Sequence, residues 1–219
     1  MIQRMLDVLI SIIAIVLLLP FLLPVVCVLR FTGEGEIFYT QERVGRGGRP
    51  FGLLKFATMM KNSPNIGAGE ITLTNDPRVL PIGKFLRKTK INELPQIWNI
   101  FVGHMSLVGP RPMVPNTFKK YPERDKVIIS EVRPGLTGIG SLVFRDEEQI
   151  LGTANDPKSF YDTIIIPYKS KIEVWYVNNI SLRMYITIIA ATAWVVVFPK
   201  SSLVDLIFPT LPERPSELT

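Results

Sequence analysis

The sequence predicts a mostly helical α/β protein: an apolar amino-terminal helix that enters a membrane, a small polar domain, and further helices on the membrane surface. Two bulk observations support this. The chain of 219 residues is 47% hydrophobic although 20% of its residues are charged, and its mean hydropathy is +0.26. The apolar residues are therefore concentrated in part of the chain, and the polar remainder is long enough for one domain with its own core.

The amino-terminal segment, Val8 to Leu29, carries no charged side chain. It is long enough to cross a bilayer as a helix, which takes about 20 residues. Pro20 and Pro24 each remove a backbone donor, so a bend is expected there. Cationic flanks favour the cytoplasm for both ends. A helix that enters, breaks at Pro20 and returns satisfies both constraints, so residues 1–32 are expected to be a re-entrant anchor. A straight span is the alternative. The flanking cations are Arg4, Arg30, Arg43, Arg46 and Arg49.

The polar domain is expected to cover residues 33–181. Short extended segments at 37–39 and 51–56 flank a turn-rich run and indicate a pair of strands. Residues 62–69 are expected to form a loop. Helices are expected over 82–87, 93–102, 121–131 and 157–178, the last of them kinked by Pro167.

The carboxyl-terminal part, residues 182–219, begins with an apolar run at 184–198 that is short for a membrane span. An interfacial or buried helix is therefore expected there. The tail from Pro209 is rich in Pro and Glu and is expected to be disordered.

The charge balance restricts the partners. A net charge of +6 favours an anionic partner, namely nucleic acid, a phosphorylated substrate or acidic lipid. The apolar segment favours the last two. Cys27 is the only cysteine, so a disulfide framework and a zinc cluster are excluded. His104 is the only histidine, which excludes acid–base schemes that need two.

The middle of the chain is rich in arginine and proline and suggests a phosphate site. Arginine binds phosphate through a planar fork of donors, and neighbouring prolines would fix the backbone beforehand. A solvated basic face is the alternative for each cation. Glu93 follows a basic stretch, where a carboxylate could simply stabilise the start of a helix. The candidate phosphate-binding cations are Lys55, Arg87, Lys88, Arg111, Arg133 and Arg145.

Five motifs follow one another along the chain: Phe38-Tyr39-Thr40-Gln41-Glu42-Arg43-Val44-Gly45, Lys55-Phe56-Ala57-Thr58-Met59, Lys90-Ile91-Asn92-Glu93-Leu94-Pro95-Gln96, Met105-Ser106-Leu107-Val108-Gly109-Pro110-Arg111-Pro112 and Val132-Arg133-Pro134-Gly135-Leu136-Thr137-Gly138. In this order they resemble the motifs of the bacterial sugar transferases, the monotopic phosphoglycosyl transferases that start lipid-linked glycan assembly. The resemblance extends from the amino-terminal helix to about Ser181. The length of the chain is that expected of the small catalytic form of this family.

The resemblance implies an activity. Members move a sugar 1-phosphate from a UDP-sugar to polyprenyl (undecaprenyl) phosphate and release UMP. They do so at the cytoplasmic face of the bacterial inner membrane, as the first membrane step of O-antigen, capsule, exopolysaccharide or glycoprotein assembly. Residues 33–181 would then be the catalytic domain. The expected partners are the UDP-sugar, the lipid phosphate and membrane lipids, and no nucleic acid; a homo-oligomer is compatible with the sequence.

The resemblance also implies roles for individual residues. In the family an Asp of an Asp-Glu pair attacks the β-phosphate of the donor, and the lipid phosphate then takes the phosphosugar. Mg²⁺ assists, with the Glu as its ligand, which is Glu93 here. The Pro-Arg-Pro segment helps to hold the nucleotide, and here it is Pro110, Arg111 and Pro112.

Several positions depart from the family pattern. Asn92 stands where the nucleophilic Asp is expected, and a carboxamide is a far poorer nucleophile than a carboxylate. His104 replaces an Asp, Ala57 replaces an Arg, and Leu19 precedes Pro20 where the family has a Ser. Residues 139–148 also differ from the form expected of many relatives, and the donor sugar is not evident from them.

Three hypotheses follow from these departures. In the first, the chain is a transferase in which Glu93 acts as the nucleophile or supports direct attack by the lipid phosphate. In the second, the chain binds donor or lipid without turnover, as a regulatory or partner subunit. In the third, it is a membrane-associated nucleic-acid binder, which fits the charge but not the motifs.

Overall fold

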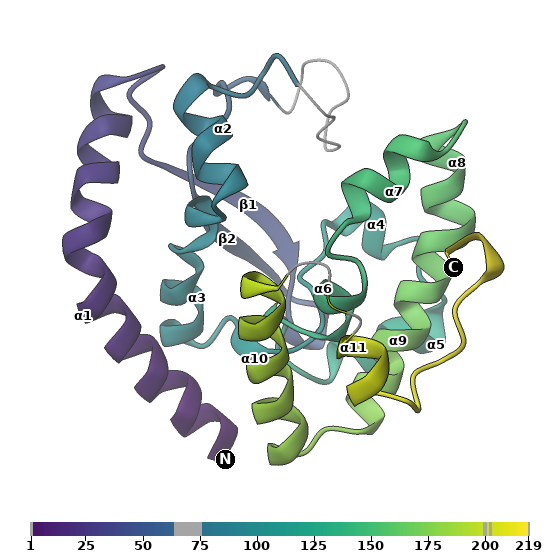
Figure 1. Ribbon diagram of the computed structural model, residues 1–219. Coiled ribbons are helices and arrows are strands. Elements are labelled where there is room, and N and C mark those ends of the chain that lie inside the picture. Colours follow the sequence, from purple (N-terminus) through teal and green to yellow (C-terminus); the bar gives the residue numbers. More distant parts are fainter. Residues whose placement is uncertain (1, 64–75, 199–200, 202, 219) are drawn as a thin grey trace.

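The computed structural model describes residues 2–63, 76–198, 201 and 203–218. Helices dominate these residues, and the strands form two small pairs (Figure 1). The predicted mostly helical α/β class is therefore confirmed. The helices are α1 (Ile2–Phe31), α2 (Pro81–Lys88), α3 (Gln96–Val102), α4 (Pro115–Phe118), α5 (Glu123–Ser130), α6 (Ile139–Val143), α7 (Glu147–Thr153), α8 (Pro157–Phe160), α9 (Ile166–Asn178), α10 (Leu182–Val197) and α11 (Leu203–Ile207). The strands are β1 (Phe38–Val44), β2 (Pro50–Phe56), β3 (Ser106–Val108) and β4 (Gly135–Thr137).

Helix α1 runs through both prolines without interruption. The expected break at Pro20 is therefore wrong as a statement about secondary structure. Figure 1 shows a bend instead, as missing backbone donors at Pro20 and Pro24 would produce. By length and composition alone, α1 is the helix of the described residues that is long and apolar enough to cross a membrane.

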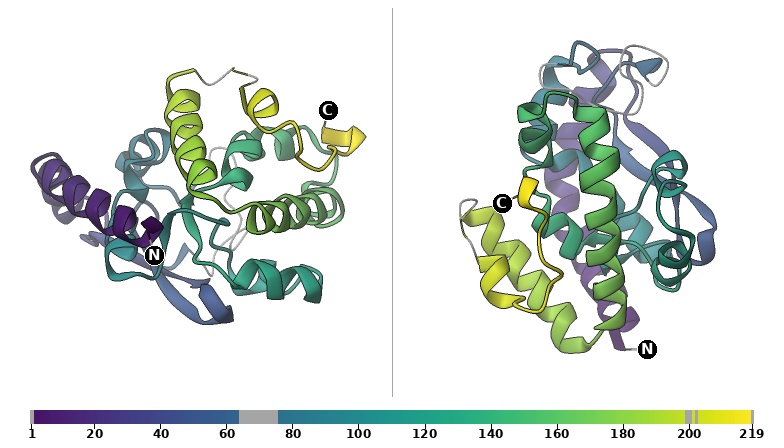
Figure 2. Two further views of the ribbon diagram at one scale, coloured as in Figure 1. Left: turned by 90° about the horizontal axis from the view of Figure 1, so that it is seen from below. Right: turned by 90° about the vertical axis from the view of Figure 1, so that its right-hand side faces the viewer.

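Both ends of α1 contact the polar domain. Near its carboxyl end, Leu29 is buried against Phe56 of β2 and Leu86 of α2. Near its amino end, Arg4 and Asp7 form hydrogen bonds with α3 and β3. Figures 1 and 2 show α1 on one side of the molecule and α9 on the other, with the strands between them.

The two strand pairs carry the loops that matter for the site. β1 and β2 form an antiparallel hairpin, close to the strand pair expected from the sequence. β3 and β4 are parallel, with Val108 opposite Thr137. The side chain of Asn99 in α3 accepts a hydrogen bond from Leu54 N (2.9 Å) and donates one to Gly52 O (2.8 Å), so α3 is fastened to β2.

The largest core cluster lies between α6, α9 and α10 and includes Ile139, Ile172 and Ile188, all fully buried. The predicted helix over 157–178 is present as α8, a π-helical turn at Tyr161–Ile165 and α9. The π turn ends at Ile165, two residues before Pro167, whose missing N–H cannot complete the regular helical pattern.

Two segments differ from expectation. Helix α3 begins at Gln96 rather than at residue 93, because Pro95 lacks the donor that would continue the 3-10 turn Ile91–Glu93 into an α-helix. The tail was expected to be disordered, but Tyr168 donates a hydrogen bond to Pro212 O (2.9 Å), and Leu211 and Leu218 pack against the core. Beyond Ser63, the expected loop at 62–69 lies outside the described residues.

Candidate functional site

Glu93 stands at the end of the 3-10 turn Ile91–Glu93, between α2 and α3. The residue before the turn, Lys90, has φ 60° and ψ 9°, the left-handed conformation that side chains other than glycine seldom adopt. Asn92 is buried, and its Oδ1 has no hydrogen-bond partner among the described residues. Strained backbone of this kind persists only where the surroundings enforce it, and it occurs often at functional sites.

Cations from three other parts of the chain surround Glu93. Burial raises the pKa of the Glu93 carboxyl, but the charges of Arg111, Lys55, Lys90 and Arg43 outweigh it and hold the pKa below its usual value. Glu93 is therefore an ionised carboxylate at neutral pH.

Lys55 of β2 belongs to the same cluster. Burial, together with the neighbouring charges of Arg43, Arg111 and Arg87, lowers the pKa of its ammonium to about 8, against the opposing effect of Glu93. The excess of positive charge makes the cluster a place where an anion would be stabilised. Of the residues predicted from sequence, Lys55, Arg87, Arg111 and Glu93 are thus brought together.

Arg43 was not predicted as a site residue, although the alternation of side chains along the β-strands places it on the same face of the hairpin as Lys55. Arg43 pairs with Phe51, and Lys55 lies four residues beyond Phe51 on the same strand, so Arg43 and Lys55 share a face of the hairpin. Arg43 also donates from Nη1 to Pro112 O (2.9 Å). It therefore ties the hairpin to the Pro-Arg-Pro loop.

The loop Pro110-Arg111-Pro112 follows β3 and is held from several sides. Its two prolines are buried, whereas the Arg111 side chain is exposed. Gly135 N donates to Pro110 O (2.8 Å), and Arg111 N donates to Glu173 Oε1 (3.2 Å). The prolines thus serve as a rigid base, and the Arg111 guanidinium is left available to a ligand.

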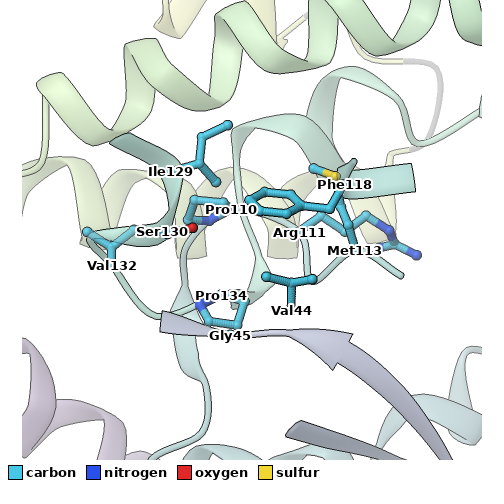
Figure 3. Close-up of a pocket in the computed structure, with 10 residues that line it drawn as sticks. All are labelled: Val44, Gly45, Pro110, Arg111, Met113, Phe118, Ile129, Ser130, Val132 and Pro134. Carbon is cyan, nitrogen blue, oxygen red and sulfur yellow. The ribbon is translucent and has the colours of Figure 1, made fainter. Parts of the chain in front are cut away.

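A small cavity lies on the inner side of this loop (Figure 3). Its volume of about 20 Å³ is enough for one water molecule and far too small for a nucleotide-sugar. Glu93 and Lys55 are not among its lining residues, so this cavity is not the place where the charged cluster would meet a substrate. It is lined by Val44, Gly45, Pro110, Arg111, Met113, Phe118, Ile129, Ser130, Val132 and Pro134.

Arg87 and the other predicted cations also have contacts within the protein. Arg87, in the last turn of α2, has Nη1 3.7 Å from Met59 Sδ. Arg133 donates from Nε to Gly103 O (2.8 Å), just beyond the carboxyl end of α3. Arg145 donates from Nε to Asp146 (3.0 Å), and its Nη1 is buried without a partner among the described residues. Substrate contacts of Arg133 and Arg145 stay predictions.

No metal cluster is evident in the part of the chain that the structure describes: no three His, Cys, Asp or Glu side chains come together there. Mg²⁺ does not require such a cluster, because one or two carboxylates and the phosphates of a substrate often complete its shell. The Glu93 carboxylate and the unpartnered, buried Oδ1 of Asn92 are oxygen ligands of the right kind. These two residues are compatible with an ion that arrives with a diphosphate.

Comparisons with known proteins point to one family. The family model described as bacterial sugar transferase matches residues 1–199. An uncharacterized sugar transferase of Haemophilus influenzae is 34% identical over 210 residues, covering 89% of this chain and 40% of the relative. The exopolysaccharide production protein ExoY of Sinorhizobium fredii is 38% identical over 159 residues, covering 66% of this chain and 70% of the relative.

A third relative carries a more specific name. The UDP-galactose-lipid carrier transferase of Erwinia amylovora is 34% identical over 208 residues, which is 89% of this chain and 40% of the relative. This chain therefore spans about two fifths of the length of the Haemophilus and Erwinia relatives and a larger share of ExoY.

Proposed function

Because the chain belongs to the bacterial sugar transferase family, we propose that it transfers a sugar 1-phosphate from a UDP-sugar to a polyprenyl phosphate and releases UMP. The reaction would be the first membrane step in building an exopolysaccharide, capsule or related glycan. The names of relatives support this, among them an undecaprenyl-phosphate galactose phosphotransferase of Salmonella typhimurium, 33% identical over 176 residues.

The observation that carries the proposal is the charge cluster around Glu93. Phosphoryl transfer depends mainly on positioning and on neutralising the charge of the phosphates. Arg111, Arg43 and Lys55 supply positive charge, and the exposed fork of Arg111 can bind two phosphate oxygens at once. A carboxylate in their midst provides the group that a phosphosugar transferase needs in order to act on the donor phosphorus.

Glu93 has two chemically complete roles. As nucleophile, its oxygen attacks the β-phosphorus, the bond from that phosphorus to the bridging oxygen breaks, and UMP leaves with that oxygen. A lipid phosphate oxygen then attacks the same phosphorus and frees the carboxylate. As a supporting residue, Glu93 orients the donor while the lipid phosphate displaces UMP directly. Asn92 cannot form the acyl phosphate, so the covalent role falls to Glu93.

Mg²⁺ is the proposed cofactor. Glu93, with the Oδ1 of Asn92, would hold it together with phosphate oxygens of the donor. When bound, the ion supplies neutralisation of the diphosphate charge. Arg111 and Lys55 would hold and orient that diphosphate.

The membrane is the proposed location, with the domain on the cytoplasmic side. Apolar side chains in the middle of α1 are widely exposed, among them Val16 (65%) and Phe21 (71%). On α10 the same holds for Val196 (74%). Since both ends of α1 contact one domain, a helix that dips into one leaflet and returns fits this geometry better than a straight span. The lipid phosphate would then meet the site at headgroup level.

The test is transfer of radiolabelled phosphosugar from a panel of UDP-sugars to polyprenyl phosphate, with the full chain in lipid nanodiscs and Mg²⁺ present. We expect label in the lipid fraction with the unsubstituted chain, and none with Glu93→Gln. Intact-protein mass spectrometry on protein incubated with donor but no acceptor distinguishes the two roles of Glu93. A phosphosugar adduct supports the covalent route, and no adduct on a preparation that transfers label once acceptor is added supports direct attack. Transfer that survives Glu93→Gln would contradict the assignment.

A further inference from the structure

Helix α1 carries a polar stripe on one face of its first three turns. Arg4, Asp7 and Ser11 are three and four residues apart, which places them on the same side of a helix. Asp7 is 2% exposed and Ser11 is fully buried, whereas Met5 on the opposite face is 64% exposed. The first turns of this otherwise apolar helix are therefore seated on the polar domain and not only inserted in lipid.

The Asp7 carboxylate is the centre of that contact. Its Oδ1 accepts three hydrogen bonds, from Leu107 N (2.9 Å), Ser106 Oγ (3.0 Å) and Tyr185 OH (2.8 Å). Two of these donors lie on β3 and the third is in the first turn of α10. Figure 1 shows the amino end of α1 beside the lower end of α10, where this contact is made. We name Asp7 with its donors Ser106, Leu107 and Tyr185 the Asp7 latch.

A buried carboxylate is tolerated only when donors replace the water it has lost. Pulling Asp7 away from β3 and α10 would leave Leu107 N and Tyr185 OH unsatisfied. Moving Asp7 into the bilayer core would be costlier still. The latch therefore opposes any movement of the amino end of α1 away from the domain.

Arg4 strengthens the same attachment one turn earlier. Its guanidinium donates to Ile100 O (2.6 Å) and Phe101 O (2.8 Å), two carbonyls in the last turn of α3, where the helix supplies few backbone donors of its own. Gly103 ends α3 with φ 94°, and a Cβ there would lie 3.2 Å from Arg4 Nη2, so this glycine leaves room for the contact. This contact therefore depends on the two parallel donors of the Arg4 guanidinium as well as on its charge.

We propose that the Asp7 latch is the determinant that keeps the amino end of α1 on the domain side of the membrane. The proposal rests on the membrane attachment put forward under the proposed function. The run Val8 to Leu29 is long enough to cross a bilayer, so a straight span competes with the re-entrant seat. The carboxyl end of α1 is buried against β2 and α2. The contacts of the amino end of α1 therefore decide between a straight span and a re-entrant helix.

The Asp7 latch and the positive-inside rule predict different effects of a substitution at residue 7 on the membrane orientation of the amino end of α1. The positive-inside rule assigns membrane orientation from Lys and Arg residues such as Arg4 and gives little weight to acidic residues. By that rule, Asp7→Asn would leave the amino end of α1 on the same side of the membrane. A latch made of hydrogen bonds loses its charged acceptor in Asp7→Asn and releases the amino end. Likewise Arg4→Lys keeps the charge but loses the paired donors to α3.

The experiment uses the full chain expressed in bacteria, with Cys27→Ser removing the only cysteine and Gln3→Cys as the reporter. Spheroplasts are treated with a membrane-impermeant maleimide before and after permeabilisation. We expect the parent to be labelled only after permeabilisation. In Asp7→Asn the fraction labelled in intact spheroplasts should rise about tenfold above background, the change that corresponds to replacing a charged hydrogen-bond acceptor with a neutral one.

Matched variants separate the latch from general damage. Met5→Asn puts the same amide on the exposed face of the same turn and should label like the parent. Tyr185→Phe and Ser106→Ala each remove one donor and leave the carboxylate, so each should give a smaller rise. Equal labelling of Asp7→Asn and the parent overturns the proposal, and so does labelling of Met5→Asn as strong as that of Asp7→Asn. Because labelling needs no turnover, a chain that transfers no phosphosugar would remove the proposed function and leave this result standing.

Discussion

The backbone N–H of Arg111 donates to the carboxylate of Glu173 across 3.2 Å, joining the Pro-Arg-Pro loop to helix α9. Glu173 is 1% exposed, and its Oε2 has no partner among the described residues. A Cβ at Gly140 would lie 2.2 Å from Glu173 Oε1, so the glycine makes room for this contact. Glu173 thus positions the main chain of the residue whose side chain faces the cluster around Glu93.

Glu173 should make stability depend on pH. Burial raises its pKa from 4.5 to about 7, against the lowering effects of the Arg111 N–H and of Lys169. Its stabilising contribution is therefore complete below pH 4.5 and is lost as the pH rises through about 7, a change of about 3 kcal/mol. Glu173→Gln should remove most of this pH dependence. Thermal unfolding between pH 4.5 and 8 measures it, and parallel curves for parent and variant would contradict the assignment.

Lys55→Met should stabilise the protein and weaken donor binding. The Lys55 pKa falls from 10.5 to about 8, chiefly through burial, so the charged ammonium costs stability below pH 8 and the cost disappears as the pH rises toward 10.5. At pH 7 the variant should gain up to about 3 kcal/mol. Its affinity for a UDP-sugar should fall about tenfold or more. Calorimetric unfolding and titration with the donor check the two effects, and a variant that loses both stability and affinity would refute the account.

The left-handed backbone at Lys90 should matter more than its charge. Asn tolerates this conformation and a β-branched side chain does not. Lys90→Asn should keep the fold and most of the transfer activity. Lys90→Val should lose at least about 1 kcal/mol and displace Glu93, with a matching loss of activity. Chemical denaturation and transfer assays on the pair test this, and equal behaviour of the two variants would show that the strain is unimportant.

Substitution of Arg111 should mainly affect donor affinity, whereas substitution of Arg133 should mainly affect stability. The Arg111 side chain is exposed within the cluster, whereas Arg133 donates to Gly103 O just beyond the end of α3. Arg111→Ala should weaken donor affinity about tenfold or more and leave stability nearly unchanged. Arg133→Ala should cost about 0.5–1.5 kcal/mol of stability with little change in donor affinity. Denaturation midpoints and donor titrations give both numbers, and a reversed pattern would place the phosphate site at Arg133.

Local patterns predicted the hairpin, helix α2 and the apolar character of α10, because strand alternation, turn residues and helical spacing act over a few residues. The basic, proline-rich middle of the chain brought Lys55, Arg87 and Arg111 into one group of candidates, and the motifs added Glu93. Arg43 was missed because its position opposite Phe51 follows from strand register, which the local sequence pattern does not determine. The hydrogen bond from Arg133 to Gly103 O, beyond the end of α3, depends on tertiary packing and could not be predicted from sequence. Asp7 accepts hydrogen bonds from Leu107 and Tyr185, which lie 100 and 178 positions away in the sequence, and no local pattern indicates such contacts.

The central claim is that the cluster around Glu93 transfers a phosphosugar although Asn92 occupies the place of the expected nucleophile. The most direct measurement is UMP release by the purified chain with Mg²⁺ and a panel of UDP-sugars, with and without polyprenyl phosphate, beside Asn92→Asp. We predict that the unsubstituted chain releases UMP only when the lipid phosphate is present, or as a single-turnover burst without it. Release by Asn92→Asp alone, with none from the unsubstituted chain for any donor that the variant uses, would contradict the claim.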